Sequence, residues 1–539
     1  MAVSATSSNL IVYLVHNYNV STVDAAQISN VVRGCMQLAP VLGAAVSDAY
    51  FGCYPVVVAG LAFSLLSFVL FTLTATLPSL LPPPCHRAGG GSTTATSCEP
   101  SNAIQSTVLY AALCLLAVGN GGTRYNMAAL GADQFVGEGR RRQGAFFSCY
   151  FAFLYASYAA GDTVLVYVQD GVSWALGFGV CVATTGLGLA ALLLGSRHYR
   201  RPVPRGSPFT ALARVAVATA RKSTVDLGSR AQYYHGCNRD AETATQPRPD
   251  QAPSDRFRFL NRAAMVAAGE TREEDGSIAK PWRLCTVKQV EDLKSLLRVL
   301  PLWSSGILVS VTVNAQVSLT VLQALTMDRA LGRRFAVPAA SITVTVLLAF
   351  VLSAALFDRL AAATPLWDGK LVVTPLRRVG LGHALNVASM AVAALVERRR
   401  IGAARGRAAA GTVVVPMSAL WLVPQLALTG AEEALHLPGN TELFYGEFPA
   451  TLRSTATAMP PLFIAAGSYL STALVDAVRR ATRWLPDDLN ESRLDSVYWT
   501  LTVLAAVNFG YFLVCATTYK YNNGGDDGNA KAQTETDVS

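Results

Sequence analysis

Charged residues are scarce in this chain of 539 residues. Asp, Glu, Lys and Arg make up 15% of it, hydrophobic residues make up 52%, and the mean hydropathy is +0.34. Ordinary soluble domains carry about 25% charged residues. The shortage excludes a soluble protein of ordinary composition and predicts a chain that lies mostly within a membrane.

Signatures of catalysis, nucleotide hydrolysis and metal binding are also missing. No Gly-x-x-x-x-Gly-Lys-[Ser/Thr] loop is present to bind ATP phosphates, the six histidines are scattered, and the ten cysteines include no Cys-x-x-Cys pair. We therefore expect a protein that is not an enzyme, with no catalytic residues, no metal and no cofactor. Cys85 and Cys98 share one polar loop and fit a disulfide and two free thiols equally well.

Long apolar runs dominate the rest of the sequence. A membrane-spanning helix needs about 20 apolar residues. This rule predicts eleven spans, at 28–49, 55–77, 106–129, 146–168, 173–195, 296–319, 337–357, 376–396, 413–435, 454–475 and 497–518. Ser8 to Val15 has the composition of the last two turns of a twelfth helix. We predict an all-α membrane protein with the major facilitator fold, built from two six-helix bundles with a truncated first helix.

The predicted bundles occupy residues 1–195 and 291–520, and a disordered tail follows at 521–539. The linker between them, 196–290, is basic. From Arg197 to Lys288 it holds 17 Lys and Arg against 9 Asp and Glu, which fits a cytosolic loop better than a nucleic-acid surface. Residues 207–222 are expected to form an amphipathic helix at the membrane surface. The expected partners are the lipid bilayer and small solutes, with no nucleic acid, and the oligomeric state is left open.

One arginine stands inside an apolar stretch. Arg124 follows the cluster Gly119-Asn120-Gly121-Gly122 in the span 106–129. A charge at membrane depth is costly, so it should face a water-filled cavity or a partner carboxylate. Its planar guanidinium suits planar anions, because it donates two parallel hydrogen bonds. We predict that Arg124 lines a transport cavity; a structural salt bridge in the first bundle is the alternative.

Two adjacent glutamates lie in the span 413–435. Side chains of neighbouring residues on a helix project about 100° apart, so Glu432 and Glu433 cannot both face one cavity. A carboxylate that is shielded from water accepts a proton more readily, which a proton carrier requires. A polar contact between helices is the expectation for the glutamate that does not face the cavity.

Several short motifs occur together along the chain. They are Ser7-Ser8-Asn9-Leu10, Gly131-Ala132-Asp133-Gln134-Phe135, Val290-Glu291-Asp292-Leu293-Lys294, Leu300-Pro301-Leu302-Trp303, Thr326-Met327-Asp328-Arg329, Val423-Pro424-Gln425 and Leu485-Pro486-Asp487-Asp488-Leu489-Asn490. With this set the chain resembles the plant nitrate/peptide transporter family, part of the proton-dependent oligopeptide transporters. The resemblance implies proton-coupled uptake of nitrate, a di- or tripeptide or another small organic anion by alternating access, in the plasma membrane or the vacuolar membrane.

The resemblance also implies roles for single residues. Glu433 aligns with the family's functional glutamate and Arg124 with its basic residue on the fourth helix, so both are candidates for proton coupling, and Arg124 also for substrate binding. In the seventh helix the candidates for substrate binding are Trp303, Asn314, Gln316 and Ser318. Packing and hydrogen bonds between helices are the alternative for these four. The alternative for Glu433 is a helix-end residue bonded to its neighbours, and Glu432 is expected to make a polar contact between helices. Asn314 stands where the family usually has Tyr or His, and it offers only a neutral donor.

Gating and the missing motif complete the comparison with the family. Asp48 and the pair Asp358-Arg359 fall at matching ends of helices two and eight, where they could form gate contacts; solvated loop charges are the alternative. The family's Glu-x-x-Glu-Arg motif on the first helix is absent. Asp162, which has no counterpart in the family pattern, is a candidate replacement carboxylate for Arg124. A chain without the motif is alternatively a transport-inactive or sensor-like membrane protein.

Overall fold

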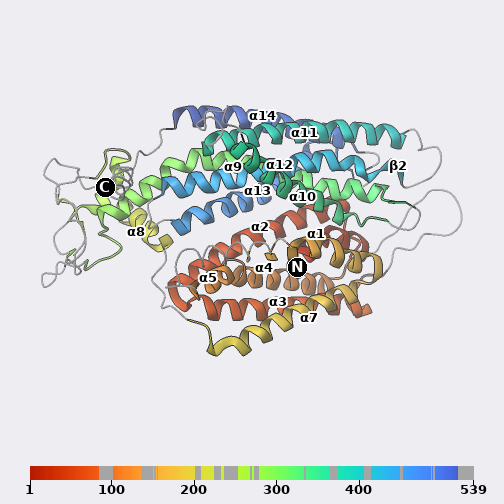
Figure 1. Cartoon of the computed structure of the whole chain (residues 1–539), viewed down its shortest axis with the longest axis horizontal. Coiled ribbons are helices and arrows are strands. Elements are labelled where there is room, and N and C mark those ends of the chain that lie inside the picture. The colour runs from red at the N-terminus through yellow and green to blue at the C-terminus, as the bar shows by residue number, and fades with distance from the viewer. Residues whose placement is uncertain are drawn as a thin grey trace.

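Two helical bundles lie side by side in the computed structural model of the chain (Figure 1). The structure describes residues 1–83, 101–134, 150, 153–154, 156–200, 208–223, 232–235, 253–266, 270–271, 278–332, 336–363, 374–405, 414–448, 453–486, 489 and 492–519. Cys85, Cys98 and the predicted tail at 521–539 lie outside the described residues.

The N-terminal bundle runs through the red to yellow part of Figure 1. Its helices are α1 (Ala2–Asn17), α2 (Thr22–Val46), α3 (Cys53–Thr76), α4 (Ala103–Thr123), α5 (Asn126–Asp133) and α7 (Trp174–Leu194). Between α5 and α7, residues 156–172 are helical and include the π-helical turns η3 (Gly161–Leu165) and η4 (Val168–Val172). A further π turn, η1 (Ser47–Phe51), extends α2.

The C-terminal bundle occupies the green to blue part of Figure 1. Its helices are α9 (Val287–Thr326), α10 (Val344–Ala363), α11 (Pro375–Arg405), α12 (Val423–Glu447), α13 (Arg453–Ala481) and α14 (Leu494–Thr518). α9 begins at a capping box, in which the Thr286 hydroxyl accepts from the backbone N–H of Gln289 and the Gln289 side chain accepts from that of Thr286. We call the end of the molecule where α7 stops and α9 starts the linker end, and the opposite end the far end.

Eight helices in the described part of the chain are long and apolar enough to cross a membrane. The predicted spans 28–49 and 413–435 fall on α2 and α12, which are helical but carry more polar residues. The predicted start of the second of these is wrong. Val415–Ser418 forms the short strand β2, which pairs in parallel with β1 (Met327–Asp328), so α12 begins only at Val423.

The predicted fragment at Ser8 to Val15 belongs to a longer helix, α1, of 16 residues. α1 begins halfway along the N-terminal bundle (Figure 1). Leu10 to Leu14 are buried, and the Tyr13 ring packs edge-on against Phe178 of α7 with 5.3 Å between ring centroids. Its buried apolar turns hold α1 in the bundle and leave its first turns beside the space between the bundles.

Glycines bring α2, α3 and α4 into backbone contact. A Cβ on Gly43 of α2 would lie 2.0 Å from the carbonyl oxygen of Gly121, and one on Gly122 would lie 2.9 Å from the Cα of Gly60 in α3. Small residues allow this approach in a membrane, where hydrophobic burial does not drive helix association. The glycine cluster noted in the sequence thus joins three helices.

Part of the linker is a folded module, which we define as α8 (Pro208–Arg221), the 3₁₀ helix η6 (Arg258–Ala264) and the first turns of α9. The predicted amphipathic helix is confirmed as α8. Its apolar residues Val215 and Ala218 are fully buried against the rest of the module, including Leu260. Protein therefore covers this face, and the expected position of the helix at the membrane surface stays a prediction.

Polar contacts join the two bundles toward the far end. Asp24 of α2 pairs with Arg479 of α13 at 2.5 Å, and Ser318 of α9 donates to Asn30 of α2 at 2.5 Å. Further along α2, Cys35 meets the Tyr469 hydroxyl at 3.2 Å. None of these contacts involves α2 beyond Cys35, so they hold the bundles together over the far half of that helix.

Candidate functional site

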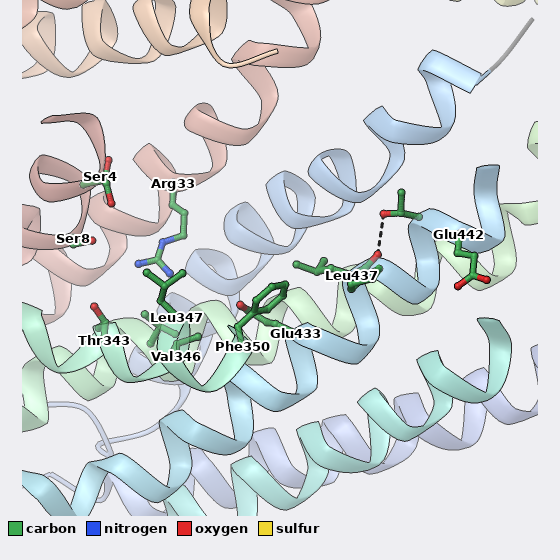
Figure 2. Close-up of a pocket in the computed structure, with 14 residues that line it drawn as sticks. Ser4, Ser8, Arg33, Thr343, Val346, Leu347, Phe350, Glu433, Leu437 and Glu442 are labelled. Atoms are coloured by element: carbon green, nitrogen blue, oxygen red, sulfur yellow. Dashed lines mark hydrogen bonds between the residues drawn. The ribbon is translucent and has the colours of Figure 1, made fainter. Parts of the chain in front are cut away.

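A cavity of about 960 Å³ lies between the bundles (Figure 2). The N-terminal bundle contributes α1 and α2, and the C-terminal bundle contributes α9, the 3₁₀ helix η7 (Ala340–Thr343), α10 and α12. The lining residues are Ser4, Ser7, Ser8, Arg33, Val317, Thr343, Val346, Leu347, Phe350, Glu433, Leu437, Pro438, Thr441 and Glu442. The cavity reaches toward the linker end as far as the exposed Glu442. This volume is at the upper end of the range of small-molecule sites, about 300–1,000 Å³.

Glu433 and Arg33 bring opposite charges to this cavity from the two bundles. Figure 2 shows Arg33 projecting from α2 toward the wall formed by α10 and α12, which carries Glu433. The guanidinium interacts electrostatically with the Glu433 carboxylate. Within the described part of the chain, however, neither side chain forms an ion pair or a hydrogen bond. Both charges are therefore available to a solute and a proton.

Glu432 points away from the cavity, into the C-terminal bundle. Its side chain is 1% exposed and lies 3.8 Å from the ring of His436, one turn along α12. His383 of α11 packs edge-on against His436 and stacks on Phe512 of α14. The sequence argument that only one of the two glutamates can face the cavity agrees with this geometry.

Arg124 lies elsewhere in the N-terminal bundle. It caps the C-terminal end of α4, donates to the Gln37 side chain of α2 at 2.7 Å, and lies 5.9 Å from the Tyr125 ring centroid. It is not among the residues that line the cavity. No carboxylate of the described residues pairs with it, so neither the cavity nor the salt bridge expected from the sequence is seen around this side chain.

The four candidates on the seventh helix, now α9, also lie away from the cavity. Trp303 donates to the carbonyl of Met459 in α13 at 2.9 Å, and the Asn314 amide donates to Ser310 in its own helix. Gln316 is fully buried and donates to Ser389 of α11. Ser318 makes the contact to α2 described above. Their hydrogen bonds within the protein agree with the alternative of contacts between and within helices; Val317 alone represents α9 in the cavity wall.

The predicted gate is only partly described. The side chains of Asp48 and Asp358 lie outside what the structure describes, and Arg359 is exposed at the linker end of α10. The ion pair Asp24–Arg479, which the sequence analysis did not single out, instead joins the bundles at the far end. Its two residues are 455 positions apart, so no local motif could have indicated the pair.

Arg33 is the main site residue that the sequence analysis missed. The residue stands in the span 28–49 and is the only Lys or Arg within it. The rule applied to Arg124, that an intramembrane charge needs a cavity or a partner, applies equally to Arg33. A count of every charge within the predicted spans would have found it.

Comparisons with known proteins agree with this architecture. A model of the POT family, PTR2, matches residues 54–490. The chain belongs to the POT family. Two Arabidopsis thaliana relatives are Protein NRT1/ PTR FAMILY 2.3, 43% identical over 96% of this chain and 89% of the relative, and Protein NRT1/ PTR FAMILY 2.7, 42% identical over 97% and 90%. The predicted family resemblance is confirmed.

Solved structures of POT-family proteins share the fold. An auto-inhibited POT family peptide transporter superposes with a TM-score of 0.67 at 16% identity, covering 97% of this chain and 95% of that one. The POT family transporter PepTSo gives 0.65 at 14% identity, covering 96% and 95%. The predicted major facilitator fold is therefore confirmed. This POT-family protein is an integral, multi-pass membrane transporter, and the proteins of its family are transporters rather than enzymes.

Proposed function

We propose that this transporter couples proton binding at Glu433 to the uptake of a small organic anion held by Arg33. One observation carries the proposal: a carboxylate from one bundle and a guanidinium from the other face a single cavity without an ion pair between them. Alternating access moves such a site from one side of the membrane to the other as the bundles rock. The plasma membrane and the vacuolar membrane are the proposed locations.

Charge balance links the proton to the substrate. An ionised Glu433 attracts Arg33 and repels an incoming anion. When Glu433 is protonated, Arg33 is left to the anion, so the loaded cavity carries the same net charge as the empty one. Uncompensated charge is costly at membrane depth. Because neither state adds net charge to the cavity, the transporter can pass through its closed intermediate both with and without substrate.

The cavity wall favours an anion with an apolar body over nitrate. Val317, Val346, Leu347 and Phe350 form one side of the cavity. A nitrate ion would fill little of this volume and would leave that wall without a partner. An aromatic or aliphatic carboxylate would instead place its charge on Arg33 and its body against these side chains.

Uptake by the full chain in proteoliposomes tests the proposal. The external pH would be about 5.5 or about 7.5, on either side of the range in which a shielded carboxylate titrates. The probes are labelled nitrate, alanylalanine and phenylacetate. We expect faster uptake at the acidic pH and the highest rate for phenylacetate. Equal flux at both pH values would contradict proton coupling, and no uptake of any probe above empty liposomes would favour the transport-inactive alternative.

Two matched pairs of variants locate the function. Glu433→Gln should abolish the acceleration by acid, whereas Glu432→Gln, one residue away but turned into the bundle, should retain it. Arg33→Gln should raise the KM for phenylacetate at least about tenfold, as expected for loss of a charged hydrogen-bonding partner, whereas Arg124→Gln should leave it near the parent value. Undiminished acid-driven uptake in Glu433→Gln would remove that residue from the mechanism.

A further inference from the structure

Asp162 lies behind the serine wall of the cavity. It belongs to the π turn η3, and its Oδ1 accepts from the Ser4 hydroxyl at 2.6 Å and from the Ser8 hydroxyl at 3.1 Å. Ser4 and Ser8 both line the cavity. Two donors on one oxygen hold the carboxylate in place and offset part of the cost of burying its ionised form.

Asp162 also lies where the two bundles meet. Its backbone carbonyl accepts from the Ser341 hydroxyl of η7 at 3.0 Å, a contact between the bundles. Its carboxylate interacts electrostatically with Arg33. The guanidinium is therefore within electrostatic range of one carboxylate in its own bundle, Asp162, and of another in the opposite bundle, Glu433.

We propose that Arg33 is shared between Asp162 and Glu433, and that Asp162 compensates its charge when Glu433 is protonated and no anion occupies the cavity. This assignment rests on the proposed role of Glu433 as the proton acceptor. Asp162 acts through Arg33, so it is a positioning residue. Without it, protonation of Glu433 in the empty cavity would leave the guanidinium unpaired, and leaving one buried charge uncompensated is strongly unfavourable.

Few other titratable groups face these three. The terminal amine of Met1 lies within electrostatic range of Asp162. Glu432 interacts with Glu433 from the side away from the cavity. Glu442 lines the same cavity nearer the linker end. The lining residues from α9, η7 and α10 are Val317, Thr343, Val346, Leu347 and Phe350, and none of these titrates. The charge on Arg33 is therefore governed mainly by the two carboxylates.

The test is a pH titration of Glu433 by infrared spectroscopy on the detergent-solubilised full chain, without substrate. The protonated-carboxyl band of Glu433 is identified by its loss in Glu433→Gln. In Asp162→Asn, Arg33 is left to Glu433 alone, so the ionised form of Glu433 is favoured. We expect the titration midpoint to move to lower pH by about half a unit to one unit, the usual scale for a neighbouring charge.

Asp170→Asn is the matched control. Asp170 lies in η4, the next π-helical segment along the chain, and pairs with Arg329 at 4.0 Å rather than with Arg33. Its removal should leave the midpoint of Glu433 unchanged, and Asp162→Glu, which keeps the charge, should do the same. An unchanged midpoint in Asp162→Asn, or an equal shift in both Asn variants, would overturn the proposal.

If Asp162→Asn does not fold, a second variant tests the same proposal. The double change Ser4→Ala with Ser8→Ala removes both donors to Asp162 and should shift the midpoint in the same direction by a smaller amount; no shift would again overturn the proposal. Because the titration needs no transport, its outcome is separate from that of uptake. Acid-driven uptake with no midpoint shift would leave the proposed function standing and Asp162 without this role.

Discussion

Single charged side chains in this transporter differ in what surrounds them. Arg33 faces a cavity and two carboxylates, Arg124 meets a neutral amide, and Arg400 of α11 is fully buried. Arg400 donates to both carboxylate oxygens of Glu397, at 2.7 and 2.8 Å, and to the carbonyl of Leu489 at 2.9 Å. One residue type thus faces a cavity in one helix and lies in the interior of a bundle in another.

Arg400→Met should destabilise the C-terminal bundle. The change leaves the Glu397 carboxylate buried without its cation, and breaking a buried pair from one side costs about 3–5 kcal/mol. We expect a clear fall in the thermal unfolding midpoint of the detergent-solubilised protein. Arg399→Met is the control, because Arg399 is exposed and stacks over Trp421 with its carbon 4.4 Å from the ring centroid. A double variant with Glu397→Leu should recover part of the loss; equal midpoints for Arg400→Met and the parent would contradict this reading.

At the residue scale the sequence predicted Glu433 but not its partner. Adjacent glutamates in an apolar span are a visible signal, and the helical period shows that only one can face a cavity. Arg33 and Asp162 are 129 positions apart, and only the packing of the helical segments places Asp162 behind the wall of the cavity that Arg33 lines. The two alternatives for Gln316 stayed open for a similar reason, since a polar side chain in a span fits a cavity and a bundle interior equally well until its neighbours are known.

Among the helices, close backbone contact makes the first bundle sensitive to added volume. Gly43→Ala would place a methyl group 2.0 Å from the Gly121 carbonyl oxygen. α2 would have to move away from α4, and overpacking of this kind costs about 1–3 kcal/mol. We expect a lower thermal unfolding midpoint for this variant.

Gly188→Ala in α7 is the control for that prediction. A Cβ at Gly188 meets nothing within 4 Å, so the variant should match the parent or gain slightly from the better helix propensity of alanine. If Gly43→Ala were as stable as Gly188→Ala, the close contact of α2 with α4 would not be present in solution.

The linker module should open when its buried ion pair is removed. Lys222 pairs with Glu270 at 2.6 Å, with both side chains nearly inaccessible. Cys285 lies in the same core, where burial raises the pKa of its thiol to about 11. We expect Lys222→Met to accelerate alkylation of Cys285 at neutral pH, followed by mass spectrometry. Lys288→Met, which removes an exposed lysine, should leave the rate unchanged; the same slow rate in both variants would show that the pair does not hold the module closed.

The helices were predictable because membrane insertion demands long apolar runs, and most predicted spans lie on helices of the structure. The start of α12 was not, because Val415 and Met417 are as apolar as a helix start, although they belong to the strand β2 that pairs with β1. The sequence also did not predict that protein covers the apolar face of α8. An apolar helix face indicates that something covers it, and the sequence does not say whether lipid or protein does so.

For the whole molecule, closure at the far end depends on contacts between the bundles. Asp24 and Arg479 are partly exposed, at 47% and 32%, so their pair contributes only up to about 1 kcal/mol. Arg479→Gln should therefore increase the alkylation rate of Cys35, at the interface of α2 and α13, by about two- to fivefold. Asp476→Asn is the control, because Asp476 pairs within α13 with Arg480. An unchanged rate in Arg479→Gln would mean that the pair does not help to close the far end.

The overall architecture followed from the sequence, but the conformation did not. Two six-helix halves and a polar linker are visible in the distribution of apolar residues. A secondary transporter passes through several arrangements of the same halves, which a single sequence encodes together. The arrangement in which Asp24 pairs with Arg479 is one of them. Its contacts are visible only when the positions of the helices in space are known.

α9 has 40 residues, so it is about 60 Å long, roughly twice the thickness of the hydrocarbon layer. Its first turns, which belong to the linker module, therefore extend beyond the hydrocarbon layer. A tilt of the C-terminal bundle by only about 10° would displace a point about 30 Å along this helix by about 5 Å. A fluorophore on the module would thus register rocking motions too small to follow at the cavity itself.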